Sequence, residues 1–155
     1  MTAQDLVQMY SFSRMALGMN LDGMTHADSL IVPQPGGNCA NWLLGHMIAS
    51  REQIYLAIGA PRMWSEAEVA VYDRGTPGHS IRPDFRSWDE LIRELDRSQT
   101  TLLSALGGLD QATLDRTTER GTIGGRVAFL NFHEAYHIGQ VGLVRRLIGK
   151  EGAIQ

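Results

Sequence analysis

The stretch that indicates the fold most clearly runs from residue 123 to residue 149 and reads IGGRVAFLNFHEAYHIGQVGLVRRLIG. Four apolar residues in it recur at helical spacing and fall on one face: Leu130, Val141, Val144 and Ile148. Gly149 follows them and is a typical stop signal for a helix. We therefore expect a long helix from Ile123 to Ile148 with one side turned toward a core.

Three other segments carry the same kind of helical signal, and they are residues 2–20, residues 38–58 and residues 87–107. Thr2 and Asp5 resemble a capping pair for the first of these helices, and Asn38 is the expected N-cap of the second. Ser87 and Glu90 form a capping box at the start of the third. Four long helices with apolar stripes in 155 residues predict an all-α fold, a four-helix bundle that forms a single domain over residues 1–155.

The longest segment without a regular pattern lies between the second and third of the four helices, over residues 60–86. We expect a short helical turn over residues 65–70 within it. A long loop in a compact domain is often a lid or a binding loop. Strand-like alternation is nearly absent from the chain, so we expect plain connectors over residues 30–37 and residues 108–122.

The charge balance argues against one large class of function. Lysine and arginine together number 14, whereas aspartate and glutamate number 17, which gives a net charge of −3. A chain of this charge lacks the positive surface that a nucleic-acid-binding protein needs. We therefore expect no nucleic-acid partner.

The sequence also lacks the features of a secreted or membrane protein. No basic region precedes an apolar block near the N-terminus, as it would in a signal peptide. The longest uncharged stretch, residues 29–50, is interrupted by prolines and glycines and is unsuited to span a membrane. Cys39 is the only cysteine, which excludes an intramolecular disulfide. We expect a soluble, cytoplasmic protein with no membrane partner.

Two histidines, His133 and His137, lie four residues apart on the apolar face of the last helix. One helical turn, about 6 Å, separates them along the helix axis, so both rings can point the same way. Two imidazoles placed like this can bind one divalent ion. The spacing leaves open the alternative that one or both are core histidines hydrogen-bonded to the backbone or to carboxylates.

His46 is a third histidine that we expect to face the core, from the helix over residues 38–58. Three imidazole ligands would leave a coordination position open for water or substrate, as in catalytic rather than structural metal sites. The alternative for His46 is again a buried histidine bonded to a neighbouring helix. His26 and His79 lie in segments outside the predicted core, and we interpret both as surface residues.

The letters HEAYH also match the H-E-x-x-H motif of zinc metallopeptidases, in which Glu134 would be the general base. The motif needs a third metal ligand further along the chain. Leu143 stands where one peptidase class has a histidine, and Glu151 is the only acidic residue after His137. A metallopeptidase is therefore a disfavoured alternative.

Two blocks together resemble a known family: NCANWLLGHMIASREQIYLAIGAP over residues 38–61 and HEAYHIGQVGLVRRLIG over residues 133–149. They are similar to the DinB-like (YfiT-like) superfamily of metal-dependent proteins. The resemblance implies an up-down-down-up four-helix bundle and a homodimer. It also implies a site for nickel, zinc or a similar divalent ion, with its ligands at His46, His133 and His137. Some related proteins use a low-molecular-weight thiol in transfer or isomerisation, and others are described as hydrolases.

From these observations we expect a metal-dependent hydrolase or a thiol-dependent transferase that acts on a small molecule. The alternative is a non-catalytic metal-binding protein of the stress response. Metal-bound imidazoles usually donate their second N–H group to an oxygen. The candidates for that supporting role are Glu134, Gln140, Gln53 and Ser50.

Two further features of the last helix concern its neighbours. Arg126 lies on the His133 side, two turns earlier, and is either a binding group for an anionic substrate or an ordinary solvent-facing arginine. Ala135, Gly139 and Gly142 form a strip of small residues on the opposite side. Because glycine within a helix costs about 1 kcal/mol, we expect this strip to permit close approach of another helix, from this chain or from a second copy.

Overall fold

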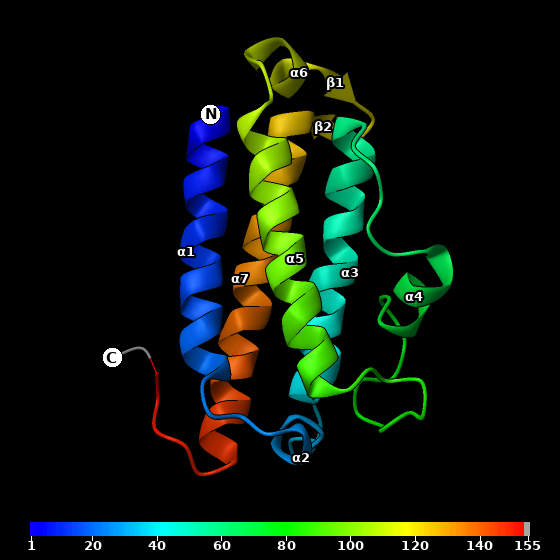
Figure 1. Ribbon diagram of the computed structural model, residues 1–155, viewed down its shortest axis with the longest axis vertical. Coiled ribbons are helices and arrows are strands. Elements are labelled where there is room, and N and C mark those ends of the chain that lie inside the picture. Colours follow the sequence, from blue (N-terminus) through cyan, green and yellow to red (C-terminus); the bar gives the residue numbers. More distant parts are fainter. Residues whose placement is uncertain (154–155) are drawn as a thin grey trace.

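Figure 1 shows the computed structural model of the protein, which describes residues 1–153. Most of the described residues are helical, so the predicted all-α class is confirmed. The elements, in chain order, are α1 (Ala3–Leu21), α2 (His26–Ser29), α3 (Ala40–Ile58), α4 (Glu66–Val71), α5 (Trp88–Gly107), α6 (Gln111–Asp115), β1 (Thr117–Thr118), β2 (Gly121–Thr122) and α7 (Ile123–Leu147). The four long helices, α1, α3, α5 and α7, agree with the predicted ranges to within about two residues at each end.

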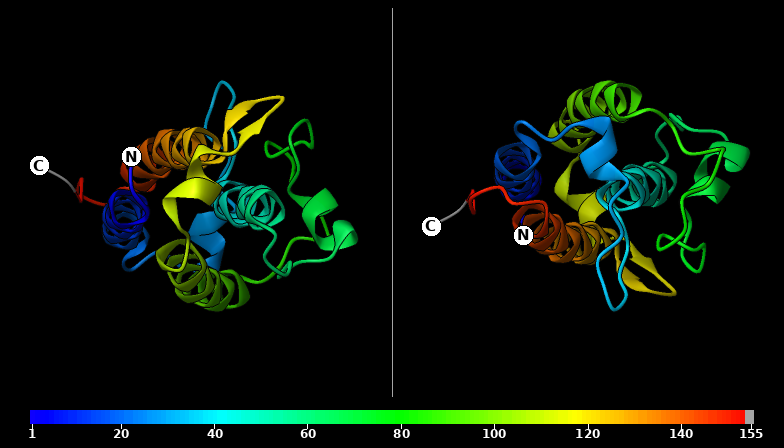
Figure 2. Two further views of the ribbon diagram at one scale, coloured as in Figure 1. Left: turned by 90° about the horizontal axis from the view of Figure 1, so that it is seen from above. Right: turned by 90° about the horizontal axis from the view of Figure 1, so that it is seen from below.

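The four long helices pack side by side, and their directions along the bundle match the up-down-down-up arrangement that the family resemblance implies. α1 and α7 both begin at the upper end of the molecule in Figure 1, whereas α3 and α5 both end there. α1 and α3 each pack against both α5 and α7. Viewed along the bundle, α1 therefore lies opposite α3 and α5 lies opposite α7 (Figure 2). The antiparallel contact between α3 and α7 is the one that brings the predicted histidines together.

Local capping explains where two of the long helices begin. The Thr2 side chain accepts a hydrogen bond from the Asp5 backbone, and the Asp5 carboxylate accepts one from the Thr2 backbone. Ser87 and Glu90 make the same reciprocal pair at the start of α5. Each pair satisfies backbone N–H groups that have no partner within the helix. Both predicted capping motifs are confirmed.

The start of α3 differs from the prediction, because its N-cap is Cys39 and not Asn38. Cys39 makes no side-chain capping bond. Its backbone N–H instead donates to the carbonyl of Gly78, 2.9 Å away, which ties the helix start to the loop that precedes α5. A contact between distant segments has therefore replaced the local cap that the sequence suggested.

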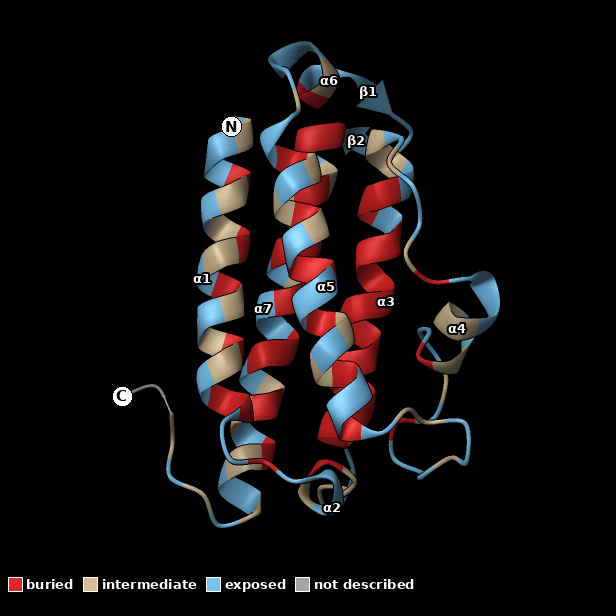
Figure 3. Cartoon of the chain, in the orientation of Figure 1, coloured by how far each residue is buried: buried red, intermediate tan, exposed pale blue. Residues whose placement is uncertain are grey.

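The segment over residues 60–86 covers the outer side of α3, and Figure 3 shows that α3 is buried along most of its length. Trp64 and Tyr72 of this covering segment are buried in the core. The carboxylate of Glu52, on α3, accepts hydrogen bonds from the backbone of Met63 and Trp64 at 3.2 and 3.0 Å. The helical turn predicted over residues 65–70 is present as α4. The segment is anchored to the bundle by these contacts.

The core consists of two apolar clusters with polar residues between them. One cluster contains Trp42 and Leu91, and the other contains Tyr10 and Leu102. The polar residues that lie between them along the helices form a central polar layer, which we define as Arg51, Ser98, Gln99 and Glu134; all of them are buried. Buried polar groups of this kind must be hydrogen-bonded to one another to be tolerated.

The connector predicted over residues 108–122 contains structure that the sequence analysis missed. α6 and the small antiparallel pair β1–β2 lie there, at the upper end of the bundle in Figure 1. Strands of two residues are too short to show alternation, which is why the pattern of the sequence gave no sign of them. Within residues 1–153, no helix has the length and apolar character that crossing a membrane requires.

Candidate metal centre

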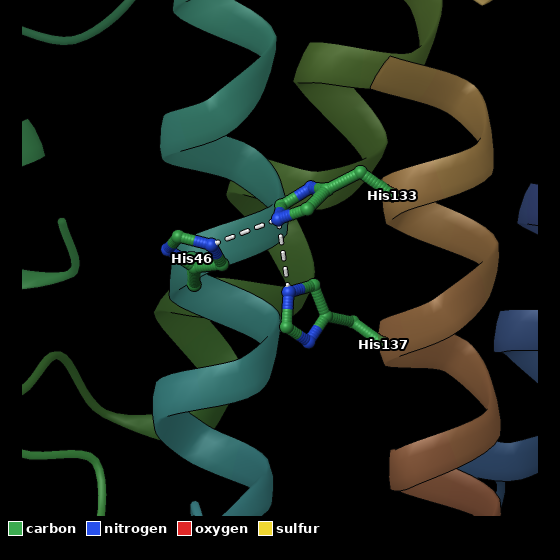
Figure 4. Close-up of side chains that lie close together, drawn as sticks. All are labelled: His46, His133 and His137. Carbon is green, nitrogen blue, oxygen red and sulfur yellow. Dashed lines mark hydrogen bonds between the residues drawn. The ribbon is translucent and has the colours of Figure 1, made fainter. Parts of the chain in front are cut away.

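The structure brings the three predicted histidines together between α3 and α7, as Figure 4 shows. The Nε2 atom of His133 lies 3.3 Å from Nε2 of His46 and 3.1 Å from Nε2 of His137. One ring nitrogen of each histidine lies within 4.8 Å of the other two. Two nitrogens bound to one ion at about 2.1 Å are roughly 3.0–3.4 Å apart in octahedral or tetrahedral geometry. The two closest separations therefore match those of ligands to a shared ion.

Two of the three rings are oriented by a hydrogen bond on the side away from the cluster. Nδ1 of His46 lies 2.7 Å from the carbonyl oxygen of Tyr72, and Nδ1 of His137 lies 2.6 Å from Oε1 of Gln140. Both partners are acceptors, so each Nδ1 carries the proton and donates it. The Nε2 atoms of His46 and His137 then present lone pairs to the centre of the cluster, which is the form that binds a metal.

The third ring, His133, has no satisfactory arrangement of hydrogen bonds. Its Nδ1 atom is buried and has no partner among the described residues. Its Nε2 atom faces the lone pairs of His46 and His137 and can donate a proton to only one of them. A cation at the centre would accept a lone pair from all three rings at once. The residues therefore fit a divalent metal ion.

The environment keeps these histidines in the neutral form. Burial lowers the pKa of His46 and the pKa of His137 below the ordinary value for histidine. Burial, with the repulsion that protonated rings of His133, His137 and His46 would exert on one another, lowers the pKa of His133 to about 4. Neutral imidazole is the ligand form, so protons compete weakly with a metal at neutral pH.

His46 is held in place by aromatic packing as well as by its hydrogen bond. The ring of Trp42, one turn earlier on α3, stacks on His46 with centroids 4.6 Å apart and planes 7° from parallel. The Tyr72 ring packs directly over Gly45, and a Cβ atom at that glycine would overlap the ring. The Tyr72 hydroxyl is fixed in turn, because it accepts a hydrogen bond of 2.7 Å from the backbone N–H of Arg86. Burial raises the pKa of Tyr72 to about 12.

Glu134 has a different role from the two that the sequence suggested for it. Its carboxylate accepts two hydrogen bonds from Arg51, from Nε at 2.9 Å and from Nη2 at 2.7 Å. Both residues are buried in the central polar layer, and Glu134 does not line the cleft beside the histidines. The prediction that Glu134 supports a metal ligand is therefore wrong. The general-base role of a metallopeptidase glutamate is contradicted by the same geometry.

The Arg51–Glu134 ion pair is strongly held. Burial by itself opposes the charge of Arg51, but the charge of Glu134 and its hydrogen bonds outweigh that effect and raise the pKa of the guanidinium. Arg51 also donates to Ser98 at 3.2 Å and to Gln99 at 2.9 Å. The ion pair thus links three of the long helices, α3, α5 and α7, beside the histidine cluster.

Of the other three residues that the sequence suggested as supports for the imidazoles, one contacts a histidine and two line the cleft without contacting one. Gln140 lies where a supporting residue should, in contact with His137. Gln53 lines the cleft but accepts a hydrogen bond from Arg126, at 2.5 Å, and not from a histidine. Ser50 also lines the cleft, and within residues 1–153 no hydrogen bond joins it to a histidine. His26 lies apart from the cluster, where its Nδ1 accepts from the backbone of Trp88, and His79 is an exposed residue that does not line the cleft.

A cleft of about 610 Å³ opens beside the histidine cluster. Its walls come from α3, α7, the segment after α4 and the β1–β2 turn, and the residues that line it are Trp42, His46, Ser50, Gln53, Asp73, Arg74, Arg120, Arg126, Phe129, Leu130, His133, Tyr136 and His137. The volume lies within the usual range for small-molecule sites. A small molecule can therefore reach the face of the cluster that the helices leave open.

One supporting group was missed by the sequence analysis, namely the backbone carbonyl of Tyr72. A backbone carbonyl is present at every residue and leaves no mark in the sequence. The nearest indirect signal is Gly45, immediately before His46, because a glycine in a helix suggests that something packs closely there.

Comparison with known proteins identifies the family to which this site belongs. The sequence model described as the DinB superfamily matches residues 9–141, which include all three histidines. No curated protein matches the chain.

Proposed function

The chain belongs to the DinB superfamily, and from that premise we propose that it binds one divalent metal ion through His46, His133 and His137 and acts as a metal-dependent enzyme. The observation that carries the proposal is the convergence of three neutral imidazoles, of which two have a fixed Nδ1 proton and therefore direct their Nε2 lone pairs at the Nε2 atom of the third. Such an arrangement is costly without a cation at its centre. Nickel and zinc are the proposed ions, since imidazole suits both.

Two reaction types suit this site, hydrolysis and group transfer from a low-molecular-weight thiol. A divalent ion held by three histidines keeps positions free, where it can polarise a carbonyl or lower the pKa of a coordinated water or thiol. The chain itself contributes the open cleft, the aromatic wall of Trp42 and Tyr136, and the hydrogen bonds that fix the imidazoles. A small-molecule substrate is proposed because the cleft has the volume of a small-molecule site.

The first experiment tests metal binding. Metal-free protein is titrated with Zn²⁺ and with Ni²⁺, and we expect one ion per chain. His137→Ala should abolish that binding and leave the helical content measured by circular dichroism nearly unchanged, because the apolar clusters supply most of the stability. His79→Ala is the matched control, since it removes an exposed histidine outside the cleft. Binding that survives His137→Ala would contradict the proposal.

A second experiment separates an enzyme from the alternative, a non-catalytic metal-binding protein of the stress response. Cobalt-substituted protein is titrated with azide and with a small thiol. A spectral change with either ligand supports an open coordination position, and a change specific to the thiol favours the transferase. The loaded protein is then tested with electrophiles and esters, with and without the thiol. Metal that binds but admits no added ligand would favour the non-catalytic alternative.

We also propose that the protein is a cytoplasmic homodimer. The outer faces of α1 and α7, two helices in contact with each other, carry exposed apolar residues, which are Phe12, Met15, Met19, Phe132, Leu143 and Leu147. Exposed apolar side chains that gather on two neighbouring helices are a feature of surfaces that bind another protein. Gly139, on the same outer face of α7, has open space where a Cβ atom would be, which allows a partner helix to come close.

The other glycine of the predicted small-residue strip has a neighbour within the chain. A Cβ atom at Gly142 would lie 3.1 Å from Oδ1 of Asn20, on α1. Gly142 therefore permits the packing of α1 on α7, whereas Gly139 remains available to a second copy. Light scattering tests the dimer: Leu143→Asp should give monomers, and Ile81→Asp, an exposed apolar residue on the covering segment, should not.

A further inference from the structure

The cleft beside the histidines is lined by three arginines, Arg74, Arg120 and Arg126. Among the residues that the structure describes, none of them makes an ion pair with a carboxylate, although six other arginines do. Asp73 is the one acidic residue in the lining, and its charge acts on His46. The cleft therefore carries an excess of positive charge in a protein whose net charge is −3.

Arg126 is the best placed of the three arginines. One of its Nη2 hydrogens is donated to Oε1 of Gln53, 2.5 Å away, and its guanidinium lies 5.4 Å from the centre of the Phe129 ring. These two contacts fix the planar group and leave most of its N–H donors free. Arg120 lines both the cleft and the adjoining cavity together with Arg126, and partial burial with the charge of Arg120 lowers the pKa of Arg126.

The helical positions of Arg126 and its partner Gln53 give their separation from the histidine cluster along the bundle axis. Arg126 precedes His133 by seven residues on α7, and its partner Gln53 follows His46 by seven residues on α3. Because these helices are antiparallel, both residues lie on the same side of the cluster, roughly 10 Å from it along the bundle axis. The cleft connects the two positions, and its apolar walls include Phe129 and Tyr136.

We propose that Arg126, supported by Arg120, binds the oxyanion of a small organic acid whose reacting part lies at the three histidines. This inference rests on the proposed function and adds the chemical class of the substrate. Guanidinium groups bind carboxylates and phosphonates through paired N–H donors, so an oxyanion matches Arg126 in shape as well as charge. The Phe129 side chain, which lines the cleft between Arg126 and His133 along α7, favours an apolar body in the substrate. A positive cleft also attracts anions from solution.

A second cavity, of about 470 Å³, supports this placement of the anion. It lies next to the cleft and shares three residues with it: Gln53, Arg120 and Arg126. The two arginines thus stand between the cleft and an outer cavity whose other lining residues include Leu56, Ile123 and one acid, Glu119. An oxyanion held at this boundary would meet both cations while the rest of the acid extends along the cleft toward the histidines.

The test uses zinc-loaded protein and three probes: benzoate, phenylphosphonate and benzamide. Benzamide has the shape of benzoate without its charge. Calorimetric titration should show that benzoate and phenylphosphonate bind, and that benzamide binds at least about tenfold more weakly. Arg126→Gln should weaken the binding of both anions at least about fivefold and leave zinc stoichiometry unchanged. Arg93→Gln is the matched control, because Arg93 is exposed on α5 and does not line the cleft.

Each contrary outcome has a distinct meaning. The inference is overturned if Arg126→Gln binds benzoate as tightly as the parent protein, if benzamide binds as well as benzoate, or if neither anion binds. Zinc content is measured on the same samples, so any of these results in protein that holds zinc would leave the proposed metal site intact. Protein that takes up no zinc would contradict the proposed function, and benzoate binding that depends on Arg126 in that protein would still support the anion site.

Discussion

Replacing Glu134 with glutamine tests the interpretation of this residue as a structural partner of Arg51. The substitution keeps the size of the side chain but removes its charge. The Arg51 guanidinium then remains charged and buried, with Ser98 and Gln99 as its only other hydrogen-bond partners among the described residues. We therefore expect a large loss of stability. A catalytic glutamate would behave differently, since its replacement would lower activity and leave stability almost unchanged.

The magnitude follows from the burial of the pair. The Arg51 and Glu134 side chains are 1% and 4% exposed, so water screens the remaining charge poorly. Removal of one partner from such a pair lowers the free energy of unfolding by about 3–5 kcal/mol. In a protein of this size that corresponds to a fall of roughly 6–20 °C in the unfolding midpoint. The double variant Arg51→Met/Glu134→Leu removes both charges. It still leaves Ser98 and Gln99 without the donor that Arg51 supplied, and we expect this loss to lower the free energy of unfolding by about 1–3 kcal/mol.

Urea denaturation followed by circular dichroism measures these free energies, in metal-free protein and at fixed pH. Glu119→Gln is the control, because Glu119 is exposed and makes no ion pair within residues 1–153. We expect the double variant to be more stable than either of its component single variants, Arg51→Met and Glu134→Leu. A Glu134→Gln protein within about 0.5 kcal/mol of the parent, or a double variant whose loss equals the sum of the single losses, would refute the reasoning.

Three further predictions concern the histidines and their supports. Gly45→Ala places a methyl group where the ring of Tyr72 lies, so it should shift the carbonyl that orients His46 and weaken zinc binding roughly tenfold in a competition titration. Gln140→Leu removes the acceptor of a neighbouring imidazole proton and should weaken zinc binding roughly 10–100-fold; an unchanged affinity would show that this hydrogen bond is not needed. Metal-free protein should lose stability as the pH falls from 6.5 toward 4, because the unfolded chain takes up protons at the ordinary histidine pKa and the folded chain does so only at a lower pH. Thermal melts across this range should show a smaller decline in His133→Leu, and an equal decline in both proteins would contradict the assignment.

The long helices were predictable because the signals that begin and end them are local. Ser87 and Glu90 are three residues apart, and the capping box that they form depends on no distant contact. Gly59 adopts a left-handed conformation, with φ of 73°, at the end of α3, where a residue with a side chain would be strained. The start of α3 was predicted wrongly for the opposite reason, because the bond between Cys39 and Gly78 joins segments far apart in the sequence.

The histidines of the candidate site were also predictable, since helical spacing places His133 and His137 on one face. The supports of the site were not. Gln140 follows His137 at a helical spacing, and its contact could be anticipated, but the Tyr72 carbonyl is a backbone group on another segment. Glu134 is next to His133 in the sequence, yet its side chain points to Arg51 on another helix. A motif that specifies residue types along one helix contains no information about which neighbouring helix supplies the counter-charge.

X-ray absorption spectroscopy of the zinc-loaded protein tests the metal centre most directly. We expect a first shell at about 2.0–2.1 Å that contains three imidazole nitrogens, together with one or more oxygen ligands from solvent. The same measurement on His46→Ala should show one imidazole fewer or no bound zinc. A first shell of oxygens without imidazole scattering, or sulfur from Cys39 at about 2.3 Å, would show that the three histidines are not the metal ligands.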